Sequence, residues 1–184
     1  MPVTLPGRLL KFVKIYRSTS MSKKPSLRHL HDAESPPRLS TSLPIPAMDD
    51  WHAWFDGAAL PNPGKIGVGV LLIAPDGKRH EHSIKTALNG CSNEAELHAL
   101  IAVMELSLAA NCKRLRVHGD SQVAIRHVTG EETTEIARLN LLIVKAQQLR
   151  TRFDELQLIW VPRHRNIEAD RLSRAALGLL AKPL

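Results

Sequence analysis

The stretch 55-FDGAALPNPG-64 decides the fold, because it carries a carboxylate from a predicted strand toward a turn. The apolar run Trp51–Phe55 before it predicts a buried strand, with Asp56 expected at its end. Only small residues and an Asn-Pro-Gly turn follow Asp56. An Asp-Gly pair alone is typical of a turn, so a functional role for Asp56 requires partners elsewhere in the chain.

Strands and helices alternate downstream of this stretch. Strands are expected over 66–74 and 79–84, joined by a Pro-Asp-Gly-Lys turn. The remaining predicted elements are a helix 93–110, a strand 114–119, a short helix 122–128, a helix 135–150, a strand 156–161 and a helix from 167. This order predicts an α/β fold with a mixed sheet and helices packed on it. Three tryptophans are expected in its core: Trp51, Trp54 and Trp160. Stacking of one of them on nucleic-acid bases is the alternative, and nothing in the sequence selects which one.

The positive charge of the chain lies mainly in its first part. Residues 1–47 hold eight Lys and Arg against two acidic residues, whereas the rest hold seventeen against sixteen. We therefore predict a disordered basic Pro/Ser-rich tail or linker, 1–48, and a folded domain, 49–184. The tail has three alternative interpretations: a targeting segment, an overlong start, or an arm that adds phosphate affinity. A cytoplasmic protein is expected, or a mitochondrial one if the tail is a transit peptide.

The composition argues against a disulfide scaffold and against a membrane protein. Cys91 and Cys112 form neither a disulfide framework nor a CxxC zinc motif, which indicates a reducing compartment. No apolar run reaches the roughly 18 residues that a membrane-spanning helix needs. No unpaired apolar stripe indicates a dimer, so we expect a monomer without membrane contacts.

A second carboxylate of interest lies on the predicted helix 93–110. Helical spacing places Glu94, His98 and Glu105 on one solvated face. Glu96 points the opposite way, toward apolar positions. A carboxylate that faces the protein is costly unless it is paired or holds a metal. The alternative is that Glu96 caps the first turn together with Asn93.

Asp120 and Asp170 adjoin the same predicted edge of the sheet. Asp120 follows a strand, at the carboxyl edge where ligands gather in open sheets, although Asp before a helix is also a good N-cap. Asp170 lies one turn into the last helix, between its apolar face and solvent, with Asn166 as the expected cap. Clustered carboxylates repel one another by about 1 kcal/mol per pair at 4 Å in water. Such a group calls for hard cations such as Mg²⁺ or Mn²⁺.

The motifs FDGAALPNPG, SNEAEL, HGDSQ and NIEAD, in this order, resemble type 1 ribonuclease H over residues 50–178. The resemblance implies a ribonuclease H-like five-stranded mixed sheet. Its strands 1–3 are antiparallel, strands 4 and 5 run parallel to strand 1, and helices lie on both faces. It also implies an endoribonuclease that uses two Mg²⁺ ions, or Mn²⁺ as a substitute, to hydrolyse the RNA strand of RNA–DNA hybrids to 5′-phosphate and 3′-hydroxyl ends. The catalytic and metal-binding carboxylates of the family correspond to Asp56, Glu96, Asp120 and Asp170.

The resemblance also implies contacts with nucleic acid. Asn62 and Asn93 match strand-contacting positions, and an amide can address a 2′-hydroxyl or a base edge. Turn chemistry and helix capping are their alternatives. Ser92 stands where an asparagine is frequent. Arg163 and Arg165 are candidate phosphate contacts or, alternatively, solvated charges.

Two segments depart from the family pattern. GEETTEIARLN is short and acidic where many members carry a basic protrusion, so this chain is a short form. The loop PRHRN is also short, and it brings His164 closer to Asp170 than the mobile histidine of the family. His164 either assists proton transfer or product release, or is an exposed loop residue. Two alternatives to a strict hybrid nuclease stay open: activity also on double-stranded RNA, and a non-catalytic hybrid-binding module.

Overall fold

The computed structural model describes residues 50–179, so the predicted tail lies outside the described residues. Within this range no helix combines the length and the apolar content that a membrane crossing requires. The elements are β1 (Trp51–Leu60), β2 (Gly64–Ile73), β3 (Arg79–Gly90), α1 (Ser92–Ala109), β4 (Arg114–Gly119), α2 (Gln122–Thr129), α3 (Ala137–Arg150), β5 (Glu155–Trp160), the 3₁₀ helix η1 (Arg163–Arg165) and α4 (Ile167–Ala176).

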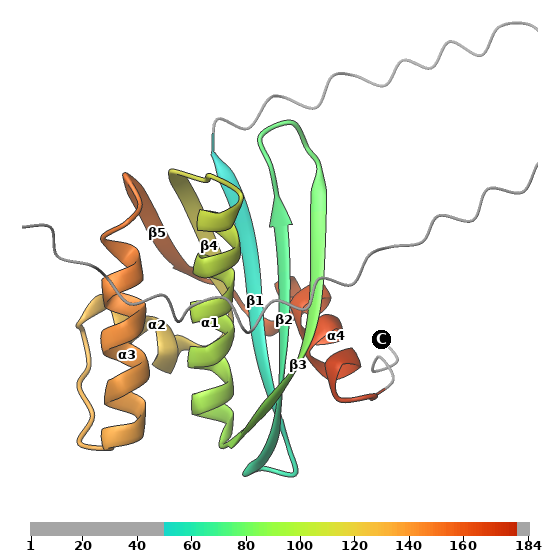
Figure 1. Ribbon diagram of the computed structural model, residues 1–184, viewed down its shortest axis with the longest axis vertical. Coiled ribbons are helices and arrows are strands. Elements are labelled where there is room, and N and C mark those ends of the chain that lie inside the picture. Colours follow the sequence, from blue (N-terminus) through green and yellow to red (C-terminus); the bar gives the residue numbers. More distant parts are fainter. Residues whose placement is uncertain (1–49, 180–184) are drawn as a thin grey trace, which may run out of the picture. The chain divides into compact units, whose positions relative to one another are not determined.

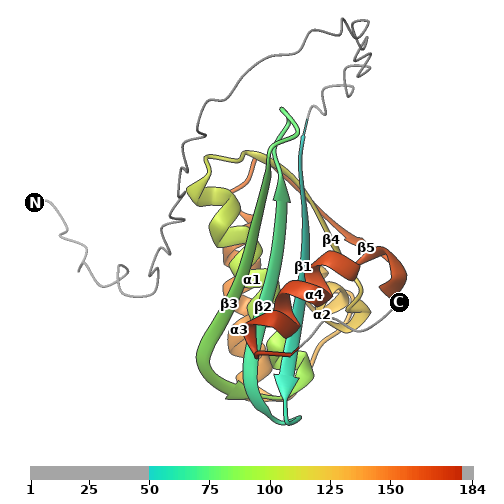
Figure 2. The ribbon, with the colours of Figure 1, turned by 90° about the vertical axis from the view of Figure 1, so that its right-hand side faces the viewer.

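The centre of the fold is a five-stranded sheet in the order β3-β2-β1-β4-β5. The β1–β2 and β2–β3 pairs are antiparallel, whereas β1–β4 and β4–β5 are parallel. Helices α1, α2 and α3 pack together on one face, and α4 crosses β1, β2 and β3 on the other (Figures 1 and 2). The predicted mixed sheet with helices on both faces is therefore confirmed.

Two of the first three strands run further than their apolar patterns predicted. β1 continues to Leu60, so Asp56 lies inside the strand, and its expected position at the strand end is wrong. The physical reason is pairing: Gly57, Ala58 and Ala59 lie opposite residues 66–68 of β2. Likewise β3 extends to Gly90. The carboxylate of Asp56 is consequently held by a continuous hydrogen-bonded strand rather than by a loop.

Alternation along β1 assigns its side chains to the two faces of the sheet. Ala53 and Phe55 are fully buried in the core beneath α1, whereas Trp54 and Asp56 point to the face of α4. Trp160, in contrast, is 51% exposed at the end of the edge strand β5, so its predicted core position is wrong. The largest fully buried apolar residues are Phe55, Ile66, Leu72, Leu100, Met104, Leu115, Val68, Val70, Val103, Val117 and Val128.

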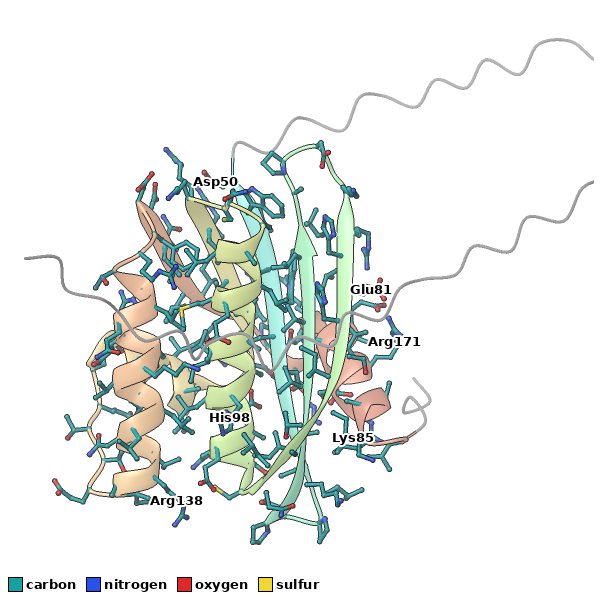
Figure 3. The ribbon with its side chains drawn as sticks, in the orientation of Figure 1. Asp50, Glu81, Lys85, His98, Arg138 and Arg171 are labelled. Atoms are coloured by element: carbon teal, nitrogen blue, oxygen red, sulfur yellow. The ribbon has the colours of Figure 1, made fainter. Side chains whose placement is uncertain are left out.

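Helix α4 lies with its backbone directly against β2. A Cβ on Gly69 would come within 2.2 Å of the carbonyl oxygen of Ala169, so the close approach requires glycine. Glu81 of β3 fastens the outer side of the helix through an ion pair with Arg171, at 2.7 Å (Figure 3). Because Gly69 is the β2 partner of Asp56, this packing brings α4 next to that carboxylate.

Candidate active site

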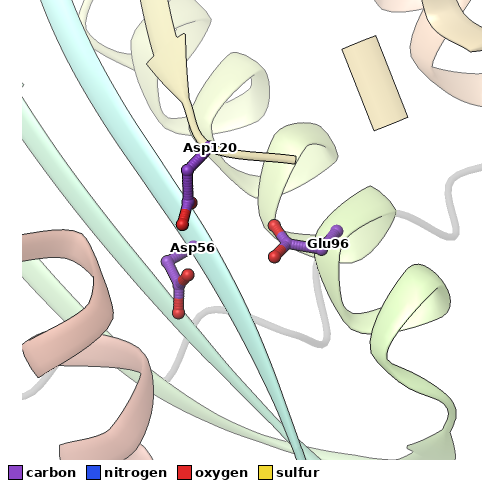
Figure 4. Close-up of side chains that lie close together, drawn as sticks. All are labelled: Asp56, Glu96 and Asp120. Atoms are coloured by element: carbon purple, nitrogen blue, oxygen red, sulfur yellow. The ribbon is translucent and has the colours of Figure 1, made fainter. Parts of the chain in front are cut away.

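Three carboxylates from three different elements meet on the described part of the chain. Asp56 of β1, Glu96 of α1 and Asp120, which follows β4, each offer an oxygen, and these oxygens lie within 4.8 Å of one another (Figure 4). The parallel pairing of β1 with β4 places the two aspartates side by side. Glu96 approaches them from the first turns of α1. The sequence had predicted a cluster of carboxylates at one edge of the sheet.

Gly57 allows Glu96 to reach this cluster. A Cβ at this position would lie 2.1 Å from the backbone carbon of Ala95, so a side chain there would push α1 away from β1. Without one, the backbone of α1 rests on the strand beside Asp56. The glycine of the Asp-Gly pair therefore serves close packing of a helix, not a turn.

Asp56 is the most enclosed of the three carboxylates and is only 7% exposed. Burial raises the pKa of Asp56 to about 6, and the charges of Asp120 and Asp170 act in the same direction. The Ser173 hydroxyl of α4 opposes this shift by donating a hydrogen bond to the Asp56 carboxylate. Ser173 is fully buried, and the sequence analysis did not single it out.

Glu96 faces the cluster with one oxygen that has no partner. Among residues 50–179, its Oε2 is buried and accepts no hydrogen bond. Burial, with the charges of Asp56 and Asp120, holds the pKa of Glu96 well above its usual range. The capping alternative for Glu96 is wrong, because Glu94 fills that role by accepting from the backbone N–H of Cys91 at 2.8 Å. Glu96 therefore remains available to a ligand.

Asp120 is held in place by Asn166. The Asn166 amide donates to Oδ1 of Asp120 at 2.7 Å and to the carbonyl oxygen of Phe55 at 2.9 Å. Asn166 is 1% exposed and is the N-cap residue of α4, as predicted, although its side chain forms no capping hydrogen bond. The capping alternative for Asp120 is also wrong, because Ser121 caps α2 by accepting from the backbone N–H of Ala124.

Asp170 lies near the cluster but outside the group of three. Its Oδ1 forms an ion pair with Nη2 of Arg163 at 3.0 Å, and Oδ2 lies 3.9 Å from Nε of Arg174. Its charge nevertheless contributes to the raised pKa of Asp56. Arg163, a candidate phosphate contact, thus forms an ion pair with Asp170, the fourth of the predicted carboxylates.

The other predicted contact residues form two exposed groups. Asn62, in the turn after β1, accepts a hydrogen bond from the backbone N–H of Ser92 at 3.0 Å, which ties this turn to the start of α1. Asn93 follows directly, and all three residues are exposed. His164 and Arg165 are exposed on η1. The structure thus joins Asn62 with Ser92 and Asn93, and keeps His164 and Arg165 in a separate group with Arg163.

The donor set of the cluster fits a hard divalent cation. All three clustered groups are carboxylates, the ligand type that Mg²⁺, Ca²⁺ and Mn²⁺ prefer. The raised pKa values of Asp56 and Glu96 reflect burial and like-charge repulsion, which a bound cation would relieve. The unpartnered oxygen of Glu96 adds a ligand atom that no described protein group uses. Asp56, Glu96 and Asp120 could therefore hold a metal, with Asp170 beside them.

We expect Ser173→Ala to weaken the site moderately. The substitution removes a donor to the buried Asp56 carboxylate, so the free energy of unfolding in EDTA at pH 7 should fall by about 1–3 kcal/mol. Urea unfolding followed by circular dichroism measures this change. Ser173→Thr keeps the hydroxyl and serves as the comparison. Equal stability of Ser173→Ala and the unchanged protein would show that the hydroxyl does not support Asp56.

Residues 54–176 match the protein family described as Reverse transcriptase-like. The chain is 36% identical over 126 residues to Ribonuclease HI of Halobacterium salinarum, a match that covers 68% of this chain and 63% of that protein. It is also 30% identical over 128 residues to the Bifunctional protein Rv2228c of Mycobacterium tuberculosis, of which it covers 35%. The chain thus spans less than two thirds of the length of these relatives.

Two solved structures resemble the described fold. The crystal structure of RNase H1 from Halobacterium salinarum NRC-1 superposes with a TM-score of 0.67 at 35% identity, covering 70% of this chain and 98% of that one. LC11-RNase H1, solved in complex with an RNA/DNA hybrid, gives a TM-score of 0.64 at 27% identity and covers 70% and 97% of the two chains.

Proposed function

Because this chain belongs to the reverse transcriptase-like, type 1 ribonuclease H family, we propose that it is a metal-dependent endoribonuclease that hydrolyses the RNA strand of RNA–DNA hybrids. The observation that carries this proposal is the cluster of Asp56, Glu96 and Asp120, with a buried glutamate oxygen left unpartnered. The LC11-RNase H1 complex supports the choice of an RNA–DNA hybrid as substrate.

The charge of the site supports metal dependence. Ionised carboxylates repel the phosphates of a nucleic acid, so the cluster cannot accept the backbone without cations between them. Two Mg²⁺ ions, or Mn²⁺ in their place, would supply Lewis-acid stabilisation of the attacking and leaving oxygens of the phosphate, giving 5′-phosphate and 3′-hydroxyl ends. The chain's own residues fix the ligands: Ser173 holds Asp56, and Asn166 holds Asp120.

Recognition of the hybrid is assigned to the exposed groups beside the cluster. Asn62, Ser92 and Asn93 present amide and hydroxyl groups at the start of α1. Such groups can both donate to and accept from the 2′-hydroxyls and base edges of a wide minor groove. Arg163 and Arg165 offer cations for phosphate.

The proposal predicts metal-dependent cleavage of a labelled RNA strand in a hybrid. Purified full-length protein should cut this RNA in Mg²⁺ or Mn²⁺, and EDTA should reduce the rate to background, because the carboxylates alone have no Lewis acid to present. RNA duplex, DNA duplex and single-stranded RNA are the matched substrates. Ligation of the downstream product and polymerase extension of the upstream one identify the 5′-phosphate and 3′-hydroxyl ends.

Each alternative has its own outcome in this assay. Cleavage of RNA duplex as well as hybrid would keep the mechanism and widen the substrate class. A folded protein that binds the hybrid but leaves it intact in both metals would be a binding module, and the proposed activity would be rejected.

A further inference from the structure

Trp160 is a large apolar side chain fixed beside the carboxylate cluster. It is 51% exposed at the end of β5, next to Gly119 of β4 in the sheet register. Its indole Nε1–H donates to the backbone carbonyl oxygen of Asp120 at 3.2 Å. The hydrogen bond anchors one edge of the ring to a carboxylate-bearing residue while half of the side chain stays open to solvent. A tryptophan held in this way loses little rotamer freedom when it binds a ligand.

Three exposed basic side chains follow Trp160 on η1: Arg163, His164 and Arg165. Arg163 has 68% of its side chain exposed, and its charge acts on Asp56 and Glu96 as well as on Asp170. Among residues 50–179, the side chains of His164 and Arg165 form no ion pair with a neighbouring acid. We call Trp160 and these three residues the β5 rim. The rim therefore combines an anchored aromatic ring with exposed basic side chains.

We propose that the β5 rim is a nucleic-acid contact surface, in which the face of Trp160 packs on the nucleoside next to the scissile phosphate while Arg163 and Arg165 contact neighbouring phosphates. This inference rests on the proposed function. An aromatic face with adjacent cations is the combination that binds nucleic-acid strands. The indole N–H is already bonded to Asp120, so Trp160 contributes packing rather than reading of a base edge.

The connection between α2 and α3 indicates why this chain needs a contact surface such as the β5 rim. Between α2 and α3 the chain presents Glu131 and Glu132, which pair with Arg126 of α2. These ion pairs neutralise the charge of Arg126. The two glutamates leave this connection acidic toward an approaching nucleic-acid strand. Since this is the place where related proteins were expected to carry a basic protrusion, affinity in this chain must come from elsewhere. The β5 rim supplies it with an aromatic ring and basic side chains.

The test compares Trp160→Ala with Trp160→Phe, because phenylalanine keeps an aromatic face and loses the indole N–H. Trp160→Ala should raise the KM for hybrid cleavage about 5- to 100-fold, the range that loss of one stacking contact gives, with kcat changed less than about threefold. Trp160→Phe should bring the KM most of the way back to that of the unsubstituted protein. Leu141→Ala, at a residue 74% exposed on α3, is the surface control and should match the unchanged protein.

Two kinetic outcomes would overturn the inference. If Trp160→Ala lowers kcat without raising KM and phenylalanine does not rescue it, Trp160 only positions Asp120 through its hydrogen bond. If both variants match Leu141→Ala in KM and kcat, the ring contacts no substrate.

A binding titration separates the rim from the proposed function. Fluorescence anisotropy of a labelled RNA–DNA hybrid in Mg²⁺, with Asp56→Asn in every protein to suppress cleavage, gives Kd for the full chain with and without each Trp160 substitution. One outcome is that the protein cuts no hybrid, but Trp160→Ala weakens binding at least fivefold and Trp160→Phe restores it. The proposed activity is then rejected, whereas the contact between the rim and nucleic acid is supported. If Trp160→Ala leaves Kd unchanged while the protein still cleaves the hybrid, the proposed role of the rim is rejected and the proposed activity is kept.

Discussion

Asp56→Asn is expected to lower the rate of hybrid cleavage by at least about 1000-fold and, in the same protein, to raise stability in the absence of metal. Asparagine has nearly the shape of aspartate but no negative charge for a divalent cation. Loss of a central ligand of this kind should remove about 4 kcal/mol or more of transition-state stabilisation, which corresponds to that rate factor. Single-turnover cleavage of labelled hybrid in Mg²⁺ measures the effect.

The gain in stability follows from the pKa of Asp56. Because burial raises this pKa from the usual 3.8 to about 6, the folded protein must hold an unfavourable buried charge at pH 7. The favourable contribution of the group is fully present below pH 3.8 and is lost as pH rises through about 6. The ionised carboxylate thus costs roughly 3 kcal/mol at pH 7 without metal, and asparagine removes this cost while its amide oxygen can still accept from Ser173.

Urea unfolding in EDTA at pH 5 and pH 7 tests this expectation. The stability advantage of Asp56→Asn over the unchanged protein should be larger at pH 7 than at pH 5, and saturating Mg²⁺ should reduce it. Asp154→Asn, at an exposed aspartate after α3, is the matched control and should change neither stability nor cleavage. An Asp56→Asn protein that is less stable at pH 7, or that still cleaves hybrid, would contradict the assignment.

The order of elements could be predicted because local patterns determine it. Apolar runs and a tight-turn signal predicted the first three strands, and helical spacing predicted the face of α1 that carries Glu96. Strand ends are different, because hydrogen bonds to a neighbouring strand continue a strand beyond its apolar run. Ala58 and Ala59 lack a strand pattern, yet they pair with Gly67 and Ile66 of β2. Trp160 ended an apolar strand and therefore resembled a core residue, but β5 lies at the edge of the sheet.

The carboxylates of the site could be predicted, whereas their supports could not. Asp56, Glu96 and Asp120 stand in recognisable sequence motifs, and Glu96 interrupts the apolar face of its helix. Ser173 lies 117 residues from Asp56, and Asn166 lies 111 residues from Phe55. A serine inside a helix and an asparagine before one are common for local reasons. Only the packing of α4 on the sheet shows that both side chains point to the site.

Asn166→Ala should therefore damage both folding and activity. The substitution leaves the carbonyl oxygen of Phe55 and the Oδ1 atom of Asp120 without their shared donor in a nearly solvent-free position. We expect the free energy of unfolding to fall by about 2–4 kcal/mol, the cost of two unsatisfied buried acceptors that partly relax. Cleavage of hybrid should fall about 10- to 100-fold even at saturating Mg²⁺, as is usual when a residue that orients a metal ligand is lost.

Asn166→Asp separates the role of the hydrogen bonds from that of shape. Aspartate fills the same space, but at neutral pH it places a second acceptor 2.7 Å from Oδ1 of Asp120 instead of a donor. If donation by the amide positions Asp120, this variant should lose at least as much activity as Asn166→Ala and should bind Mg²⁺ differently in calorimetric titration. Asn89→Ala, at an exposed asparagine of β3, controls for loss of an amide elsewhere. Full activity in Asn166→Asp would mean that Asn166 acts by packing alone, and that the strand and the fixed backbone after β4 are sufficient to hold Asp120.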